Sequence, residues 1–366
     1  MPKVNIISYG CTANEDNSQI MAGLLDEANF ELSPDFIDAD IVIINTCAVK
    51  QKTDNKIQSK IVKLANNHPE KKLIISGCMP GSEYHIIKKI APNASLINTN
   101  HVTEIVKIAN SMLQGEKVEL LEFRIESKLN LPKITKDKIY NLQVSEGCLS
   151  HCTYCSTKIA KGILKSFPKQ DIIQEIGKKV KEGYKRINLT STDMSCYGLD
   201  IKTNLPSLLN DINKIPGNFE VRVGMANPQF IKTYKEDLLK SFDSKNILKF
   251  LHIPIQSGSS KVLKEMKRGH SVEDFKDIVN LFRKKYPSIS IATDIIVGYP
   301  TETQEDFKET LDLIENIKPE VLNISKFSSR PNTPASKLKP IDSKIVLNRS
   351  KKLTELYNKY RKNIKR

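Results

Sequence analysis

Apolar residues in the first third of the chain follow two alternating patterns. Short unbroken apolar runs are typical of buried strands, whereas apolar residues spaced three and four apart are typical of amphipathic helices. The first pattern predicts strands at 4–9, 41–45, 73–77 and 95–98. The second predicts helices at 15–28, 54–66, 84–90 and 102–112. Because strands and helices alternate, residues 1–115 are predicted to form an α/β domain with a mostly parallel sheet.

A charged stretch with little apolar periodicity follows at residues 116–138, and we expect it to be a linker. The alternation then resumes. Strands are predicted at 140–144, 186–190, 219–224, 249–253, 290–297 and 321–326. Helices are predicted at 169–182, 205–214, 233–242, 272–285 and 303–317. Strand and helix units in such a succession favour an open, barrel-like parallel sheet over residues 139–340, with its active site at the carboxyl ends of the strands.

The pattern changes to a single closing helix in residues 341–366, which we expect to pack back on the second domain. Its apolar face is predicted to hold Leu353, Leu356, Tyr357, Tyr360 and Ile364. From residue 342 onward, nine basic residues stand against two acidic ones. Both a solvated helix face and contact with RNA fit this balance.

Charge and composition narrow the class of protein. The 366 residues include 57 Lys and Arg against 42 Asp and Glu, a net charge of +15 that favours a polyanionic partner such as nucleic acid. The chain has no apolar stretch of membrane-spanning length and no apolar signal-peptide core, so we expect a soluble, cytoplasmic protein. Its seven cysteines, an odd number, argue against a disulfide framework and for metal or redox chemistry.

Three cysteines, Cys148, Cys152 and Cys155, lie within eight residues directly after the first predicted strand of the second domain. This spacing lets a short loop supply three thiolates to a [4Fe-4S] cluster, because thiolate is the ligand that iron–sulfur centres use. The fourth iron is then free to chelate the amino and carboxylate groups of S-adenosylmethionine. Tyr154, just before the last cysteine, can cover the adenine of that cofactor.

The alternative for this loop is a zinc site completed by His151 or by a distant residue. Zinc motifs usually come as paired Cys-x2-Cys units, and the sequence has no second pair. A histidine between two ligands would also have to turn the same way as both.

Three more cysteines, Cys11, Cys47 and Cys78, each come one or two residues after a predicted strand. Because the carboxyl ends of adjacent parallel strands lie side by side, these thiols are predicted to converge and to hold a second cluster. Gly10 and Gly77 would allow the tight turns and the close backbone approach. A buried cysteine that only packs is the alternative for any one of the three.

Together these residues resemble the methylthiotransferase family of radical S-adenosylmethionine enzymes over nearly the whole chain. Around the first three cysteines the resemblance rests on YGCTAN (9–14), NTCAV (45–49) and GCMP (77–80). Beyond the central cysteine triplet it rests on LHIPIQSGS (251–259), MKRG (266–269), TDIIVGYPTET (293–303) and SSRPNTPA (328–335). The stretch VRVGMANP (221–228) resembles the archaeal and eukaryotic branch, which modifies N6-threonylcarbamoyladenosine at adenosine 37 in the anticodon loop of tRNA. Relatives that act on isopentenyladenosine in tRNA, or on a ribosomal-protein aspartate, share the cysteine framework.

The resemblance implies a partial (β/α)6 barrel after the N-terminal domain, two [4Fe-4S] clusters and S-adenosylmethionine. It implies that the central triplet splits the cofactor reductively, and that the resulting radical takes hydrogen from carbon 2 of the adenine. Sulfur held on the Cys11, Cys47 and Cys78 cluster, and methylated by another cofactor molecule, is then transferred to that carbon. The implied partners are tRNA, an electron-donor protein and a sulfur source.

Family members usually end in a small basic β-barrel RNA-binding (TRAM) domain, and this chain stops at Arg366, where that domain would begin. We therefore expect that domain to be absent and RNA capture to fall to the basic tail and the domain surfaces, unless the sequence is a truncated form.

Further contacts to S-adenosylmethionine are expected at strand ends of the second domain. Asp294 ends an apolar strand, and Gln256 and Ser257 follow another, although capping or turn formation explains all three as well. Arg222 alternates with apolar neighbours, and it either binds the cofactor carboxylate or satisfies a carboxylate in the core. Cys196 is expected to pack in the interior.

Two other functions remain compatible with the sequence. One is a non-catalytic two-cluster electron carrier or RNA-binding redox sensor. The other is a radical enzyme with a different outcome, such as methylation, in which Cys11, Cys47 and Cys78 would have no use.

Overall fold

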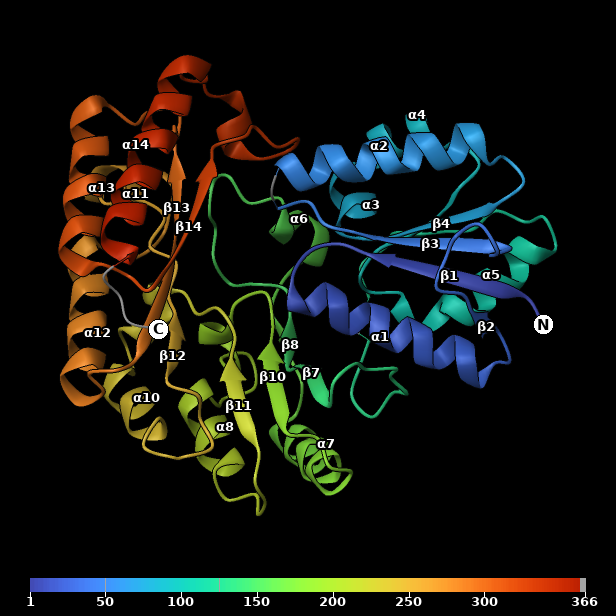
Figure 1. Ribbon diagram of the computed structural model, residues 1–366, viewed down its shortest axis with the longest axis horizontal. Helices are drawn as coiled ribbons and strands as arrows, with labels where there is room; N and C mark the ends of the chain where they lie inside the picture. The colour runs from blue at the N-terminus through green and yellow to red at the C-terminus, as the bar shows by residue number, and fades with distance from the viewer. Residues whose placement is uncertain (50, 125, 363–366) are drawn as a thin grey trace. The chain divides into compact units, whose positions relative to one another are not determined.

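The computed structural model describes residues 1–49, 51–124 and 126–362 (Figure 1). The chain forms two compact units. The first comprises Met1–Cys148 and Ser156–Thr192, and the second comprises Leu149–Cys155 and Asp193–Arg366. The loop that carries the central cysteines therefore runs from the first unit into the second and back.

The first unit contains a six-stranded parallel sheet in the order β2-β1-β3-β4-β5-β6. Its strands are β1 (Lys3–Ser8), β2 (Glu31–Leu32), β3 (Ile41–Thr46), β4 (Lys72–Gly77), β5 (Ser95–Ile97) and β6 (Glu119–Leu120). The four strands expected in this region all form. The two-residue strands β2 and β6 are too short for a hydrophobic pattern to reveal.

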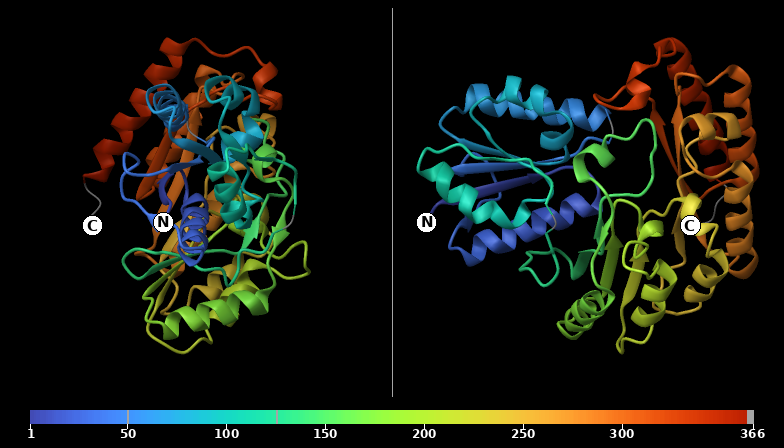
Figure 2. Two further views of the ribbon diagram at one scale, coloured as in Figure 1. Left: turned by 90° about the vertical axis from the view of Figure 1, so that its right-hand side faces the viewer. Right: turned by 180° about the vertical axis from the view of Figure 1, so that it is seen from behind.

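Helices cover both faces of this sheet (Figures 1 and 2). They are α1 (Thr12–Glu27), α2 (Gln51–Asn67), α3 (Cys78–Ser82), α4 (Tyr84–Ile90) and α5 (Ile105–Leu113), with the 3-10 turn η1 (Val102–Glu104) before α5. Successive side chains of a strand point to opposite faces. Accordingly, Ile41 and Ile43 pack with α1 and α5, whereas Val42 and Ile44 pack with α2, α3 and α4.

The charged stretch expected to be a linker is bound into the first unit. It contributes the edge strand β6 and buries two lysines. Lys128 Nζ lies 2.6 Å from Glu146 Oε1, and Lys133 Nζ lies 2.7 Å from Asp16 Oδ1. A buried charge requires such a partner, so these ion pairs hold the stretch in place.

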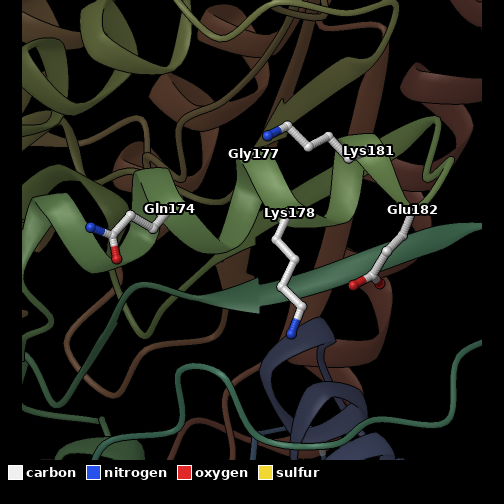
Figure 3. A pocket seen from close by; sticks show the side chains of 5 residues that line it. All are labelled: Gln174, Gly177, Lys178, Lys181 and Glu182. Atoms are coloured by element: carbon white, nitrogen blue, oxygen red, sulfur yellow. The ribbon is translucent and has the colours of Figure 1, made fainter.

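The rest of the first unit holds one parallel strand pair and one short antiparallel pair. Strands β7 (Ile139–Gln143) and β10 (Arg186–Thr190) are parallel, and β8 (Ser145–Glu146) pairs antiparallel with β9 (Lys165–Ser166). The helices are α6 (Thr157–Lys161) and α7 (Lys169–Lys181). A pocket beside α7 is lined by Gln174, Gly177, Lys178, Lys181 and Glu182, and contains none of the predicted site residues (Figure 3).

The second unit contains β11 (Glu220–Val223) and a three-stranded parallel sheet of β12 (Phe250–His252), β13 (Ser290–Val297) and β14 (Val321–Lys326). Its longer helices are α8 (Leu205–Ile212), α10 (Lys235–Ser241), α12 (Val272–Lys285), α13 (Gln304–Ile317) and α14 (Ser343–Arg361). Its short helices are η2 (Met194–Cys196), α9 (Pro228–Ile231), α11 (Ser260–Glu265) and η3 (Pro334–Lys337). The expected α/β class is confirmed, and each strand from β7 to β14 that was predicted is present.

The closing helix α14 packs on β14 and α13, and its inner face holds Leu353 and Tyr360. Arg349, counted among the basic residues of this helix, is buried and pairs with Glu302 at 2.6 Å. Ile364, also expected on the apolar face, and the last two basic residues lie outside the described residues. None of the helices in the described part of the chain is both long and apolar enough to span a membrane.

Candidate cysteine centres and cofactor site

Three cysteines of the first unit lie at the carboxyl ends of neighbouring strands. Cys11 is the N-terminal cap of α1 after β1, Cys47 directly follows β3, and Cys78 opens α3 directly after β4. Since β1, β3 and β4 are adjacent in the sheet, all three cysteines come to the same edge. Cys47 and Cys78 are buried and Cys11 is exposed.

Two glycines allow the backbone to approach these cysteines. Gly10 has φ +113°, and a Cβ on it would lie 2.8 Å from the Cβ and 3.1 Å from the Sγ of Cys47. Gly77 has φ +94°, and a Cβ on it would lie 2.4 Å from the carbonyl oxygen of Thr46. Both positions therefore require glycine, for conformation and for space.

Asn14 ties the strand ends together. Its Nδ2 donates to the carbonyl oxygens of Tyr9 (3.0 Å) and Thr46 (2.7 Å), and its Oδ1 accepts from the Sγ of Cys78 at 3.9 Å. Sequence reasoning quoted Asn14 as part of a motif but gave it no role. An asparagine early in a helix offers no signal until the strands beside it are placed.

Electrostatic interactions link the three thiols to one another. Burial is the main cause that raises the pKa of the Cys78 thiol to about 12. Lys161 acts in the opposite direction, and Cys47 and Cys11 add to the effect of burial. A raised pKa means that ionising this thiol costs free energy. Because the thiol protons must leave when a metal binds, a cationic metal centre would offset that cost.

The central triplet begins in the first unit. The backbone N–H of Cys148 donates to the carbonyl oxygen of Gly162 (3.3 Å), and its own carbonyl oxygen accepts from Lys158 Nζ (2.7 Å). Gly147, just before it, has φ +69°, and a Cβ there would collide with the carbonyl oxygen of Ile163. The start of the cysteine loop is thereby fixed against the segment that follows α6.

Cys152 and Cys155 belong to the second unit and form a turn in which the N–H of Cys155 donates to the carbonyl oxygen of Cys152 (3.2 Å). Arg268 lies over this turn. Its Nη1 donates to Cys152 Sγ and to the hydroxyl of Tyr154, both at 3.3 Å. Arg268 is buried, and sequence reasoning assigned it no role because it lies more than a hundred residues from the cysteine that it contacts.

Family models match both parts of the chain. The Uncharacterized protein family UPF0004 matches residues 3–99, and the Radical SAM superfamily matches residues 142–314. The "probable threonylcarbamoyladenosine tRNA methylthiotransferase" of Pyrococcus abyssi is 39% identical over 357 residues, which cover 96% of this chain and 83% of that protein. The human "threonylcarbamoyladenosine tRNA methylthiotransferase" is 35% identical over 367 residues, covering 98% of this chain and 63% of that protein.

The chain belongs to the threonylcarbamoyladenosine tRNA methylthiotransferase family. Its fold is that of radical S-adenosylmethionine enzymes. The methyltransferase TsrM from Kitasatospora setae matches with a TM-score of 0.65 at 13% identity, over 92% of this chain and 75% of that one.

Radical S-adenosylmethionine enzymes use a [4Fe-4S] cluster and S-adenosylmethionine, and methylthiotransferases carry two clusters. The residues of this member of the family fit both clusters. Three thiols share one sheet edge in the first unit, where Gly10 leaves room beside Cys47 that any side chain would fill. In the second unit, a buried arginine donates to a cysteine sulfur, and such hydrogen bonds are one of the features that tune iron–sulfur centres.

Two of the other predicted cofactor residues, Asp294 and Gln256, lie close together. Asp294 lies within β13 and not, as expected, at the end of that strand, and Gln256 follows β12. Asp294 Oδ2 lies 2.7 Å from His252 Nε2, and the N–H of Gln256 donates to the carbonyl oxygen of Asp294 (2.8 Å). Ser257 is buried in the turn before α11, and its Oγ accepts from the N–H of Ser259 (3.2 Å).

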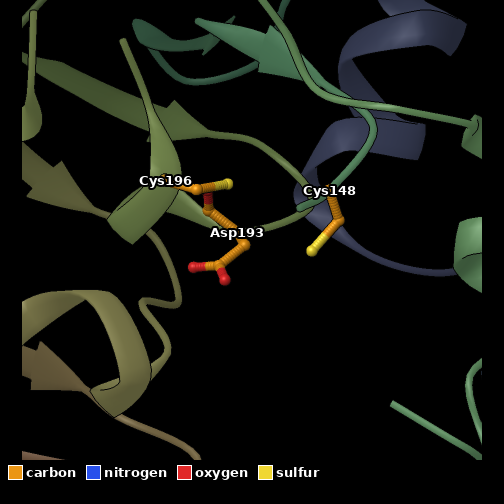
Figure 4. A group of neighbouring side chains, drawn as sticks. All are labelled: Cys148, Asp193 and Cys196. Atoms are coloured by element: carbon orange, nitrogen blue, oxygen red, sulfur yellow. The ribbon is translucent and has the colours of Figure 1, made fainter. Parts of the chain in front are cut away.

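Arg222 lies on β11, where its guanidinium stacks on the ring of Phe250 at 4.7 Å. Cys196 is fully buried, as expected, and its Sγ donates to the carbonyl oxygen of Asp193 at 3.2 Å. Figure 4 shows Asp193 and Cys196 on the same turn. The Asp193 carboxylate accepts from the N–H groups of Ser195 and Asn227, both at 3.0 Å, and burial raises its pKa.

Proposed function

We propose that this protein catalyses the radical methylthiolation of N6-threonylcarbamoyladenosine at adenosine 37 of tRNA, with S-adenosylmethionine as cofactor. The observation that carries the proposal is the pair of cysteine sets. One lies at the ends of three adjacent strands, in a domain that precedes a radical S-adenosylmethionine domain with its own triplet. The names of the Pyrococcus abyssi and human relatives support the choice of nucleoside.

In this proposal each cysteine set holds one [4Fe-4S] cluster. Cys148, Cys152 and Cys155 hold the cluster that binds S-adenosylmethionine, and Cys11, Cys47 and Cys78 hold the auxiliary cluster. The residues that contact S-adenosylmethionine are Tyr154, Arg222, Gln256, Ser257 and Asp294. When bound, the two clusters and S-adenosylmethionine would supply the carbon radical and the transferred sulfur.

The chain itself contributes orientation and the exclusion of water. Arg268 holds Tyr154 and Cys152 in one geometry, because a planar guanidinium donates in fixed directions. Asn14 fixes the ends of β1 and β3 beside Cys78. Burial of Cys47 and Cys78 keeps water from the second centre.

The partners follow from this chemistry. The substrate is a tRNA whose adenine is turned out of the anticodon loop, as enzymes that act on a base require. An electron-donor protein and a sulfur source complete the cycle, and the site of action is the cytoplasm. The net charge of +15 supports binding of a polyanion.

Mass spectrometry of tRNA nucleosides from cells lacking and regaining the gene tests the proposal. We expect methylthiolated threonylcarbamoyladenosine to disappear and then return. A change confined to the isopentenyl nucleoside would move the protein to the other tRNA branch. Release of 5′-deoxyadenosine by the reduced, reconstituted protein would exclude the electron-carrier and redox-sensor alternative.

A further inference from the structure

A buried lysine lies beside the three cysteines of the first unit. Lys161 is the last residue of α6, and only 3% of it is exposed. Burial of an ammonium group costs several kcal/mol unless it is paired. The other two buried lysines described above each have a carboxylate partner: Lys128 has Glu146, and Lys133 has Asp16.

Within residues 1–49, 51–124 and 126–362, the ammonium of Lys161 makes no hydrogen bond and no ion pair. Its electrostatic interactions are with Cys78, Cys11, Glu146 and Cys47. Since Glu146 already binds Lys128 at 2.6 Å, the charge of Lys161 is directed at the cysteine site.

The fold holds Lys161 in this position from two sides. Helix α6 packs against α3, whose first residue is Cys78, so closely that a Cβ on Gly81 would lie 3.4 Å from the Cα of Ala160. At the start of α6, Ser156 Oγ donates to the carbonyl oxygen of Ala48 at 2.8 Å, next to Cys47. The helix is therefore fastened to the segments that carry two of the three cysteines.

We propose that Lys161 binds the anionic sulfur species, a hydrosulfide or an alkylthiolate, carried on the cluster of Cys11, Cys47 and Cys78. This inference rests on the proposed function, in which that cluster carries the sulfur. Three cysteines leave one iron without a protein ligand, and a thiolate there brings a negative charge into a buried site. An ammonium with three donors stabilises that charge by charge-assisted hydrogen bonds.

The test uses the full chain with both clusters reconstituted and methanethiolate as the probe. Binding is followed by the change in the electron paramagnetic resonance spectrum of the reduced auxiliary cluster, and iron is counted in each sample. The variants are Lys161→Met, Lys161→Gln and Lys161→Arg, and the matched control is Lys63→Met, which removes an equal charge from an exposed position of α2.

We expect Lys161→Met and Lys161→Gln to keep their iron and to bind methanethiolate at least about tenfold more weakly, since hydrogen bonds to charged groups have this strength. Lys161→Arg should restore most of the affinity, and Lys63→Met should match the wild type. Unchanged affinity in the neutral variants overturns the proposal. So does loss of iron in both, because Lys161 would then serve to hold the cluster itself.

The two proposals fail separately. If the wild type modifies tRNA and the neutral variants bind methanethiolate normally, only the role of Lys161 is wrong. If cells show no methylthiolated threonylcarbamoyladenosine that depends on the gene, the proposed function is wrong, whatever the binding result.

Discussion

Arg268 donates a hydrogen bond from its buried guanidinium to the Sγ of Cys152, over 3.3 Å. The same side chain donates to Asn227 Oδ1 at 3.1 Å and to the carbonyl oxygen of Pro254 at 2.9 Å, so its position is fixed from several directions. A cation bonded to a cluster thiolate stabilises the reduced cluster more than the oxidised one, because reduction adds negative charge.

Replacing Arg268 with Met should therefore make the cluster of the central triplet harder to reduce. We expect the midpoint potential to fall by about 60 mV, which is a tenfold change in a one-electron equilibrium. A redox titration followed by electron paramagnetic resonance measures this directly. Arg361→Met, an exposed arginine on α14, serves as the control. A potential unchanged in the Arg268 variant would show that the contact does not tune the cluster.

Gly10→Ala should disturb the auxiliary centre by steric conflict. The new methyl group would meet the side chain of Cys47, and the residue would also have to keep a φ of +113°. We expect most of the iron of this cluster to be lost, measured as iron per chain after reconstitution. Gly115→Ala is a matched control, because Gly115 also has positive φ (+85°) but has nothing near its missing side chain. The Gly115→Ala variant should lose about 1–2 kcal/mol of the free energy of unfolding and should retain its iron. Equal iron in both variants would contradict the close-packing argument.

The elements that sequence patterns predicted well are those with long, regular periodicity. Strand β13 and helix α12 have the predicted bounds, and a capping box of Ser271 and Asp274 marks the start of α12. The rule that parallel strands end side by side was enough to expect Cys11, Cys47 and Cys78 at one edge.

The features that the sequence did not reveal depend on contacts between distant segments. Asn14 accepts a hydrogen bond from Cys78, and Lys161 interacts electrostatically with the same cysteine from another helix. No local pattern distinguishes these two residues from other polar residues. The buried ion pairs of Lys128 and Lys133 explain why a stretch expected to be a linker packs into the first unit.

Cys47→Ala should separate the two chemical steps. Since Cys47 belongs to the auxiliary set alone, the variant should still release 5′-deoxyadenosine but should form no methylthiolated nucleoside, both of which chromatography with mass spectrometry detects. Cys196→Ala, which changes a buried cysteine outside both sets, is the control and should keep both activities. Methylthiolation by the Cys47 variant would rule out the two-cluster mechanism.

Arg349→Met should destabilise the protein strongly. Arg349 Nη1 lies 2.6 Å from Glu302 Oε2, which also accepts from the N–H of Gly298 at 2.8 Å. Removing one partner of a buried pair leaves the other charge uncompensated, at a cost of about 3–5 kcal/mol.

Urea unfolding should show this loss of stability in Arg349→Met, and a smaller loss in the Arg349→Met, Glu302→Gln double variant. Lys351→Met, at an exposed position of the same helix, should change little. A mild effect of Arg349→Met would mean that α14 is held by its apolar face alone.

His270 makes stability depend on pH. Burial, together with the positive charge of Arg268, lowers the pKa of His270 to about 3. The folded protein therefore keeps a neutral imidazole, whereas the unfolded chain binds a proton near pH 6.5. The neutral imidazole of His270 makes its full contribution to the free energy of unfolding above pH 6.5. This contribution is lost as the pH falls from 6.5 toward 3, and about 2 kcal/mol of it is gone at pH 5.

Urea unfolding at pH 7 and pH 5 should show that His270→Asn loses about 2 kcal/mol less than the wild type over this interval. His85→Asn, an exposed histidine, should lose as much as the wild type. If the three proteins lose the same free energy, the buried imidazole does not control acid stability.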